Sequence, residues 1–297
     1  MLRPWLHAFR PRTLPLAISS IITGSALAGF FHGFRWSVFG LALLTAILLQ
    51  VLSNLANDLG DHEHGTDDES RVGPQRAVQS GAIAPAAMKR ALWVCGGLAL
   101  ASGITLIIVA LGFTATTLGF FLLGLLAIGA AVKYTFGSNP YGYAGLGDIS
   151  VVLFFGLAGV MGSCFLHTGE LRTATVLPAL GIGLLSAAML NLNNMRDAVG
   201  DAANGKRTMA VRMGTAHAKR YHAALVYGGF GCLLVFTMLH FRGWWQLAFV
   251  LGFVLLDRHL RRVQRNTVPR ELDPQMKVLA LSTLVTALLF SLGLIPG

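Results

Sequence analysis

Charged residues are scarce in this 297-residue chain, at 12% of the composition against 54% from the apolar set, with a mean hydropathy of +0.64. A soluble domain carries about 25% charged residues. This shortage argues against a water-soluble globular enzyme, a disordered protein and a nucleic-acid-binding domain, although the formal net charge is +10. The composition favours a polytopic membrane protein.

Cysteine is also scarce, because the chain has only Cys95, Cys164 and Cys232. Each lies alone in a different apolar stretch. They provide neither a metal-ligand spacing nor a disulfide framework. We expect all three to have packing roles.

Long stretches without Asp, Glu, Lys or Arg predict an all-α bundle of nine transmembrane helices, since a spanning helix needs about 20 apolar residues. The long stretches are Thr13–Phe34, Trp36–Asn57, Ala91–Val132, Ile149–Gly169, Thr173–Met195, Tyr221–Phe241 and Val278–Gly297. Ala91–Val132 is long enough for two spans, with a turn at Gly112 to Thr114. Gly243–Leu256 has only 14 residues. We count it as a span because Asp257 and Arg258 can lie at its interfacial end.

The basic residues indicate how these helices are oriented, because cytoplasmic loops collect Lys and Arg. With the N-terminus in the cytoplasm, twenty of the 23 Lys and Arg residues lie on the inner side. Only Arg35, Arg172 and Arg242 lie outside. The net charge then reflects orientation and contact with anionic lipid. We therefore expect residues 1–297 to form a single integral domain of the cell inner membrane, with acidic cytoplasmic loops near 58–90 and 196–220.

The acidic residues form two similar runs at the inner face, where twelve of the 13 fall. Asn54, Asn57, Asp61 and Gly65 recur 140 residues later as Asn194, Asp197, Asp201 and Gly205. Each run follows an apolar stretch of spanning length. Membrane proteins built from internal repeats often bind their substrate between the halves, so the repeat predicts a duplicated site.

Helical spacing places the polar residues of each run on one face of a helix, with Asp58 beside Asp61 in the first run. Ionised carboxylates at membrane depth are costly. They are tolerable if Mg²⁺, which prefers oxygen ligands and accepts substrate phosphates, lies between them. The alternative is that Asp and Asn simply end helices and face water. Asn54 and Asn191 argue against it, because they extend the polar face into the apolar run.

Five motifs, in this order, resemble the UbiA superfamily of intramembrane prenyltransferases over nearly the whole chain. They are Arg10–Pro15, Asn57–Asp61 continuing to Asp67, Arg71–Arg76, Pro140–Asp148 and Asn191–Asp201. In that superfamily, acidic motifs lie at the cytoplasmic ends of the second and sixth of nine helices. The most similar branch prenylates 1,4-dihydroxy-2-naphthoate in menaquinone biosynthesis, releasing CO₂ and diphosphate and giving demethylmenaquinone.

The resemblance implies a Mg²⁺-dependent active site that opens to the cytoplasm, with two ions bridging the diphosphate of a polyprenyl donor. The implied metal ligands are Asp58, Asp61, Asp67, Asp197 and Asp201, of which all but Asp67 are also implied as catalytic. The implied substrate-binding residues are Asn54, Asn57, Arg71, Arg76, Tyr134, Asp148, Asn191, Asn194, Lys206 and Arg212. Arginine suits bidentate phosphate contact, but each basic residue could equally touch lipid headgroups. Asp148 either holds a cation or the ring hydroxyls, or begins a helix.

The chain departs from the superfamily pattern at one position. In the superfamily, a Tyr after the fourth helix is followed four residues later by a Lys. Here Tyr134 is followed by no Lys or Arg before Pro140. The missing cation comes from Lys133 or Arg12, or is dispensable. Two other functions remain open: prenylation of another aromatic acceptor such as 4-hydroxybenzoate, and ion-coupled secondary transport. The clustering of acids at one membrane face argues against transport.

Overall fold

The computed structural model describes residues 2–65 and 72–295, and every regular element in these ranges is helical. The first half contains α1 (Leu2–Phe9), η1 (Pro11–Thr13), α2 (Leu14–Phe30), α3 (Trp36–Glu63), α4 (Pro85–Leu111) and α5 (Ala115–Lys133). The middle contains α6 (Gly147–Val151), the π-helix η2 (Val152–Gly162), α7 (Ser163–Thr168) and η3 (Thr173–Thr175). The rest contains α8 (Val176–Ala203), α9 (Met209–Leu239), η4 (Trp244–Phe249), α10 (Val250–Arg265), η5 (Pro269–Leu272) and α11 (Asp273–Leu294).

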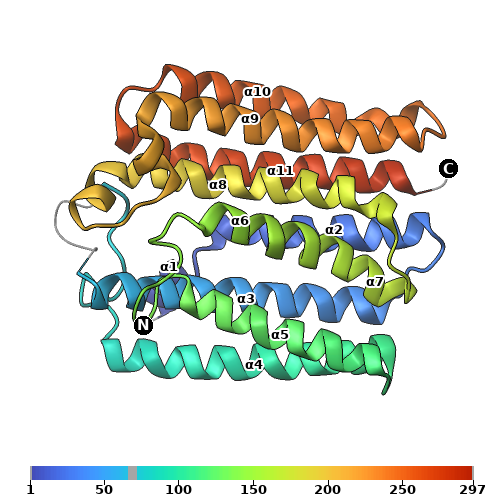
Figure 1. Ribbon diagram of the computed structural model, residues 1–297, viewed down its shortest axis with the longest axis horizontal. Helices are drawn as coiled ribbons and strands as arrows, with labels where there is room; N and C mark the ends of the chain where they lie inside the picture. Colours follow the sequence, from blue (N-terminus) through green and yellow to red (C-terminus); the bar gives the residue numbers. More distant parts are fainter. Residues whose placement is uncertain (1, 66–71, 296–297) are drawn as a thin grey trace.

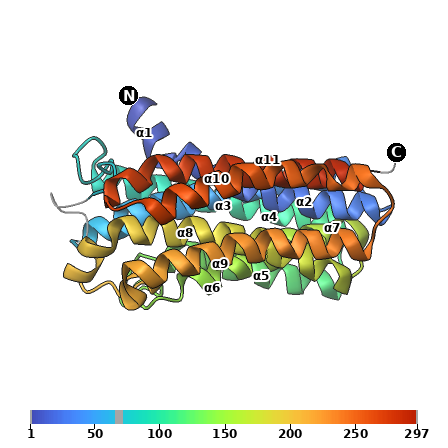
Figure 2. The same cartoon turned by 90° about the horizontal axis from the view of Figure 1, so that it is seen from above.

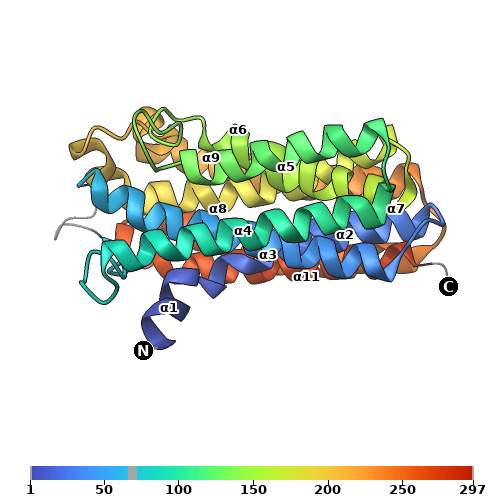
Figure 3. The ribbon, with the colours of Figure 1, turned by 90° about the horizontal axis from the view of Figure 1, so that it is seen from below.

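The long helices run side by side along one axis, as Figure 1 shows, while α1 projects at one end of the bundle (Figure 3). The connections after α3, α5 and α8 all lie at that same end (Figures 1 and 2). The sequence places these connections on the same side of the membrane, and the fold agrees. The polar residues of both acidic runs therefore meet at one end of the bundle.

Eight helices of the described chain are long and apolar enough to cross a membrane. The turn expected at Gly112 to Thr114 is present between α4 and α5. The predicted count of nine is not confirmed, because the expected stretch Gly243–Leu256 forms a short 3₁₀ segment followed by the start of α10. That helix has only 16 residues and carries arginines near its end. It nevertheless lies beside α9 and α11 along the bundle (Figure 1).

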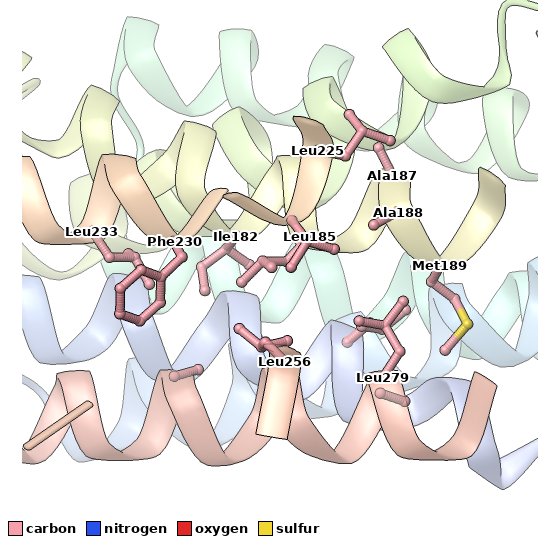
Figure 4. Packing of buried hydrophobic residues seen from close by; sticks show 14 of the residues in the cluster. Ile182, Leu185, Ala187, Ala188, Met189, Leu225, Phe230, Leu233, Leu256 and Leu279 are labelled. Carbon is pink, nitrogen blue, oxygen red and sulfur yellow. The ribbon is translucent and has the colours of Figure 1, made fainter. Parts of the chain in front are cut away.

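Buried apolar side chains of the second half form one core cluster together with those of α2. Apolar side chains gather there from α8 (Ile182, Leu185), α9 (Phe230, Leu233), α10 (Leu256) and α11 (Leu279), as Figure 4 shows. Helix α5, by contrast, has no buried residue along its apolar window. A helix that is apolar all round and exposed in the isolated chain is suited to contact with lipid.

Small residues allow α2 to approach the π-helix closely. A side chain added at Gly24 would overlap the backbone oxygen of Val160. Helix pairs in membranes commonly use small residues for such backbone contact. Because π-helical turns often occur at functional sites, this contact is relevant to the site described below.

We expect Gly24→Ala to destabilise the protein by ~1–3 kcal/mol, the usual cost of an overpacked contact. The thermal unfolding midpoint in detergent should fall. Gly29→Ala on the same helix is the matched control, since its new carbon would lie 3.8 Å from the Phe34 side chain, an ordinary contact. Equal midpoints for the two variants would show that the α2 contact is not tight.

Candidate active site

A cavity of about 380 Å³ runs through the bundle between α2, α3, α4, α5, η2, α7 and α8. Its wall along α3 extends from Asp61 to Ala42, which spans about 28 Å at the rise of an α-helix. One end is polar and is lined by Asn57, Asp61, Arg76, Asn193, Asn194 and Lys206. Most of the remaining wall is apolar. The cavity therefore has a charged end that continues into a long apolar channel.

The two acidic runs form the last turns of α3 and α8, and each helix is followed by a glycine with left-handed backbone. Gly65 has φ 67° and Gly205 has φ 73°. Glycine adopts this conformation without strain and commonly ends helices. The shared spacing in the sequence is thus a repeated helix ending, which aims both sets of polar side chains at the same place.

Asp61 occupies the polar end of the cavity and is buried. It accepts a hydrogen bond from the Tyr143 hydroxyl at 2.7 Å and forms an ion pair with Arg76 at 2.5 Å. Arg76 is itself buried and also donates to the backbone oxygen of Asn57. The first acidic run and the loop after it therefore bring a carboxylate and a guanidinium together at the cavity.

Asp58, in contrast, does not line this cavity. Its two carboxylate oxygens accept the backbone N–H groups of Ala77 and Val78, each at 3.2 Å. It lies against a second chamber of about 170 Å³, which shares Arg76 and Asn193 with the first cavity. In this structure Asp58 fixes the turn that carries Arg76.

The asparagines of the first run are cavity residues that also anchor neighbouring segments. Asn54 donates to the Phe9 carbonyl and the Thr13 hydroxyl, both at 3.0 Å. Asn57 accepts from the Thr135 hydroxyl at 2.8 Å. They connect α3 to the N-terminal segment and to the end of α5.

In the second run, the Asp201 carboxylate is buried and lies 3.5 Å from the Lys206 ammonium. Lys206 also lies over the Tyr143 ring, 5.1 Å from its centroid. Because the Tyr143 hydroxyl binds Asp61, this tyrosine links the two acidic runs. Asp197 is held in turn by Arg196, through hydrogen bonds of 2.8 and 2.6 Å.

The other predicted residues lie in different surroundings. Asn194 and Tyr134 line the cavity. Asn191 faces α9, where it donates to the Ala218 carbonyl at 3.1 Å. Arg212 is exposed and ties the loop before α6 by donating to the Ala144 carbonyl at 2.8 Å. Asp148 is buried in the first turn of α6, and the predicted residues Asp67 and Arg71 lie outside the described ranges.

The two candidates for the missing cation have different surroundings. Lys133 is exposed and donates to the Ser138 carbonyl. Arg12 lines the cavity and forms an ion pair with Asp273 at 3.0 Å. Arg12 is therefore the one placed to face a ligand.

Burial, reinforced by the carboxylates of Asp148 and Asp61, raises the pKa of Tyr134 well above its ordinary value. Its phenol stays protonated at neutral pH. It can thus serve as a hydrogen-bond donor at the cavity, but not as a base.

Three contributors to this end of the bundle are absent from the sequence prediction: Tyr143, Arg196 and Asp273. Tyr143 falls within the Pro140–Asp148 motif, so a closer examination of that motif could have found it. Arg196 directly precedes Asp197. Asp273 has no local signal, since it lies in a different helix 76 positions after Asp197.

The donor set fits Mg²⁺ bound together with a phosphate ligand. Among the described residues no three His, Cys, Asp or Glu side chains form a ready metal cage. Mg²⁺ sites that hold substrate phosphates use only one or two carboxylates. Asp61 lines the polar end of the cavity, and Asp201 lies beside Lys206, which also lines it. One buried Asp201 oxygen has no hydrogen-bond partner. These two carboxylates, supported by Asp197, suit a metal that the ligand completes.

Comparison with known proteins decides the family. The UbiA prenyltransferase family matches residues 17–294. The chain belongs to this family. It is 47% identical to a 1,4-dihydroxy-2-naphthoate octaprenyltransferase from Escherichia coli, over 98% of this chain and 94% of that protein. A protein of the same name from Haemophilus influenzae is 45% identical over 100% of this chain and 97% of its own length.

Solved structures of UbiA homologues share the fold. One from Aeropyrum pernix, in the apo form, has a TM-score of 0.69 at 15% identity and covers 98% of this chain and 97% of its own. One from Archaeoglobus fulgidus, bound to DMAPP and Mg²⁺, has a TM-score of 0.62 at 17% identity, covering 97% and 99%. The UbiA fold therefore extends over nearly all of this chain.

We expect Tyr143→Phe to raise the KM for a diphosphate substrate by about tenfold, because a hydrogen bond to a charged group contributes about 1.5–3 kcal/mol. The variant removes the hydroxyl that holds Asp61 but keeps the ring beneath Lys206. Tyr227→Phe, on an exposed part of α9, is the control. Steady-state kinetics in detergent micelles would measure both, and an unchanged KM for Tyr143→Phe would remove this residue from the site.

Proposed function

We propose that this protein transfers a polyprenyl group from polyprenyl diphosphate to 1,4-dihydroxy-2-naphthoate, with loss of CO₂ and diphosphate. The direct product is the quinol, demethylmenaquinol, which gives demethylmenaquinone when an oxidant outside this reaction removes two electrons and two protons. The proposal rests on one observation about the cavity. Acidic and basic side chains line one end of it, and most of the remaining wall is apolar. Such a cavity suits a donor with a charged head and a hydrocarbon tail. The names of the relatives at 45–47% identity support the same donor and acceptor.

The charged end binds the diphosphate. Asp61 and Asp201, supported by Asp197, would hold Mg²⁺, which when bound neutralises the diphosphate and makes it a better leaving group. Asp58 holds the turn that carries Arg76. Arg76, Lys206 and Arg12 line the same end and supply further positive charge. Electrostatic stabilisation of developing negative charge is usually the largest contribution to catalysis.

The apolar part of the cavity holds the prenyl chain and excludes water from the reacting carbon. The electron-rich naphthoate ring attacks the allylic carbon of the donor as the bond from that carbon to the diphosphate oxygen breaks. A carbon–carbon bond forms, the diphosphate leaves with the bonding electron pair, and the ring loses its carboxylate as CO₂. Water would otherwise trap the electron-deficient allylic carbon, so a dry channel protects the reaction.

We further infer that the chain crosses the inner membrane nine times, with its N-terminus and the active site on the cytoplasmic side. Two observations support this orientation. Most Lys and Arg residues lie on the same side of the membrane as the active-site loops, and cytoplasmic loops collect these residues. Helix α2 begins and α11 ends at opposite ends of the bundle (Figure 1), as an odd number of crossings requires. Residues 1–297 then act as one membrane domain, with the acidic loops near 58–90 and 196–220 on the cytoplasmic side.

The acceptor can be tested directly. Membranes containing the protein are incubated with a labelled polyprenyl diphosphate and either 1,4-dihydroxy-2-naphthoate or 4-hydroxybenzoate, and lipid products are separated. We expect label to appear in product only with the naphthoate. Product from 4-hydroxybenzoate alone would contradict the proposed acceptor, and no product from either would contradict prenyl transfer.

A further inference from the structure

Arg196 is a fully buried cation at the polar end of the bundle. Its guanidinium donates to both carboxylate oxygens of Asp197, at 2.8 and 2.6 Å, and to the Asn193 side chain at 3.0 Å. Its remaining terminal nitrogen donates to Asp273. A buried charge is costly unless it is paired and hydrogen-bonded, and Arg196 meets this condition with two carboxylates.

Asp273 is shared between two arginines. It begins α11 and accepts hydrogen bonds from Arg12 at 3.0 and 3.1 Å as well as from Arg196. The four groups together carry two positive and two negative charges. Asp273 thus joins the N-terminal segment, the last helix and the second acidic run in one balanced network.

The loop that follows the first acidic run also approaches Arg196. A side-chain carbon added at Gly73 would lie 2.6 Å from a terminal nitrogen of Arg196. Arg196 therefore lies where α8, α11 and this loop meet. The guanidinium held there hydrogen-bonds both carboxylate oxygens of Asp197, the atoms through which Asp197 would bind a metal.

We propose that Arg196 is a placeholder cation for the second acidic run and that Asp273 is the residue that positions it. This inference rests on the proposed function, in which Asp197 contributes to the Mg²⁺–diphosphate site. In the ligand-free chain Arg196 neutralises Asp197. In the loaded site Arg196 remains with Asp273, and Asp197 is released to the metal.

The charges of this network predict the direction in which metal affinity changes when Asp273 or Arg196 is replaced. Without the Asp273 carboxylate, Arg196 has Asp197 as its remaining carboxylate partner in the network and holds it more tightly. Metal binding then becomes harder. Without the Arg196 guanidinium, Asp197 has lost a cation that competes with the metal for both of its oxygens, and metal binding becomes easier. A residue that served only to hold helices together would not shift metal affinity in opposite directions in these two variants.

The experiment measures Mn²⁺ binding to the purified full-length protein by electron paramagnetic resonance, in the presence of inorganic diphosphate and without turnover. We expect Asp273→Asn to weaken binding by about tenfold, in the range of couplings within one ion-pair network. Asp273→Glu should restore it. Arg196→Met should tighten binding by about threefold or more on the same grounds. Glu271→Gln, an exposed acid on the turn just before α11, is the matched control and should match the wild type.

Folding is checked by size-exclusion chromatography, and Asp273→Asn combined with Arg196→Met is included because it removes the buried charge with its partner. This double variant should bind Mn²⁺ like Arg196→Met. Wild-type affinity in Asp273→Asn, or weaker binding in Arg196→Met, would overturn the placeholder role while leaving the proposed function standing. Unchanged binding in Asp197→Asn would remove Asp197 from the metal site and would overturn the placeholder role with it.

Discussion

Replacing Asp61 by Asn should lower kcat/KM for prenyl transfer by about 10³-fold, the scale on which removing one preorganised electrostatic group acts. Asp61 is the buried carboxylate at the cavity that meets both Arg76 and Tyr143. The amide has nearly the same shape but no charge, so it binds Mg²⁺ poorly and no longer forms an ion pair with Arg76. Kinetics with purified protein in detergent would measure the loss.

The control for this variant must separate catalysis from stability, since breaking a buried ion pair costs about 3–5 kcal/mol. Asp257→Asn on α10 removes an acid whose partner is the exposed Arg261, and should retain wild-type activity. The Asp61→Asn protein should still elute as the folded species. Activity within about tenfold of wild type in a folded Asp61→Asn protein would contradict the role of Asp61.

A bulky side chain at position Gly124 should lower activity with long prenyl donors more than activity with short ones. Gly124 of α5 lines the cavity, and a side-chain carbon added there would meet nothing within 4 Å. Gly124→Phe should therefore fold but obstruct the prenyl chain. We expect kcat/KM for a long polyprenyl diphosphate to fall by about 10²-fold, as misplacement of a substrate commonly does, while a five-carbon allylic diphosphate is affected far less.

Gly119→Phe is the matched control for this channel variant. Gly119 lies on the same helix, is exposed, and does not line the cavity. Both donors should react with Gly119→Phe as with the wild type. An equal loss for long and short donors in Gly124→Phe would show that the apolar cavity does not hold the chain.

The fold was largely predictable because charge is so scarce. Stretches without charge located the long helices, and the turn between α4 and α5 fell where it was expected. The stretch after Gly243 was harder to assign, because its apolar part is short and α10 continues into an arginine-rich end. The π-helix from Val152 to Gly162 leaves no mark in the hydropathy of the chain, since it differs from an α-helix only in its hydrogen-bond register.

The candidate site was predictable in its location and less so in its contacts. The repeated spacing correctly located two helix ends that meet, and Asp61, Asn194 and Lys206 line the cavity. Asn191 faces α9 instead, where it donates to the Ala218 carbonyl, although the three-residue spacing predicts that it shares a face with Asn194. Side-chain partners such as Asp273 depend on tertiary packing, which local spacing does not encode.

The most direct test of the central claim follows both leaving groups in one reaction. Purified protein in liposomes is given polyprenyl diphosphate and naphthoate labelled in its carboxylate, with Mg²⁺ or with a chelator, and released diphosphate and CO₂ are quantified together. We predict Mg²⁺-dependent release of the two in equal amounts, matched by prenylated product. Diphosphate release without CO₂, or turnover that is unchanged by the chelator, would contradict the account.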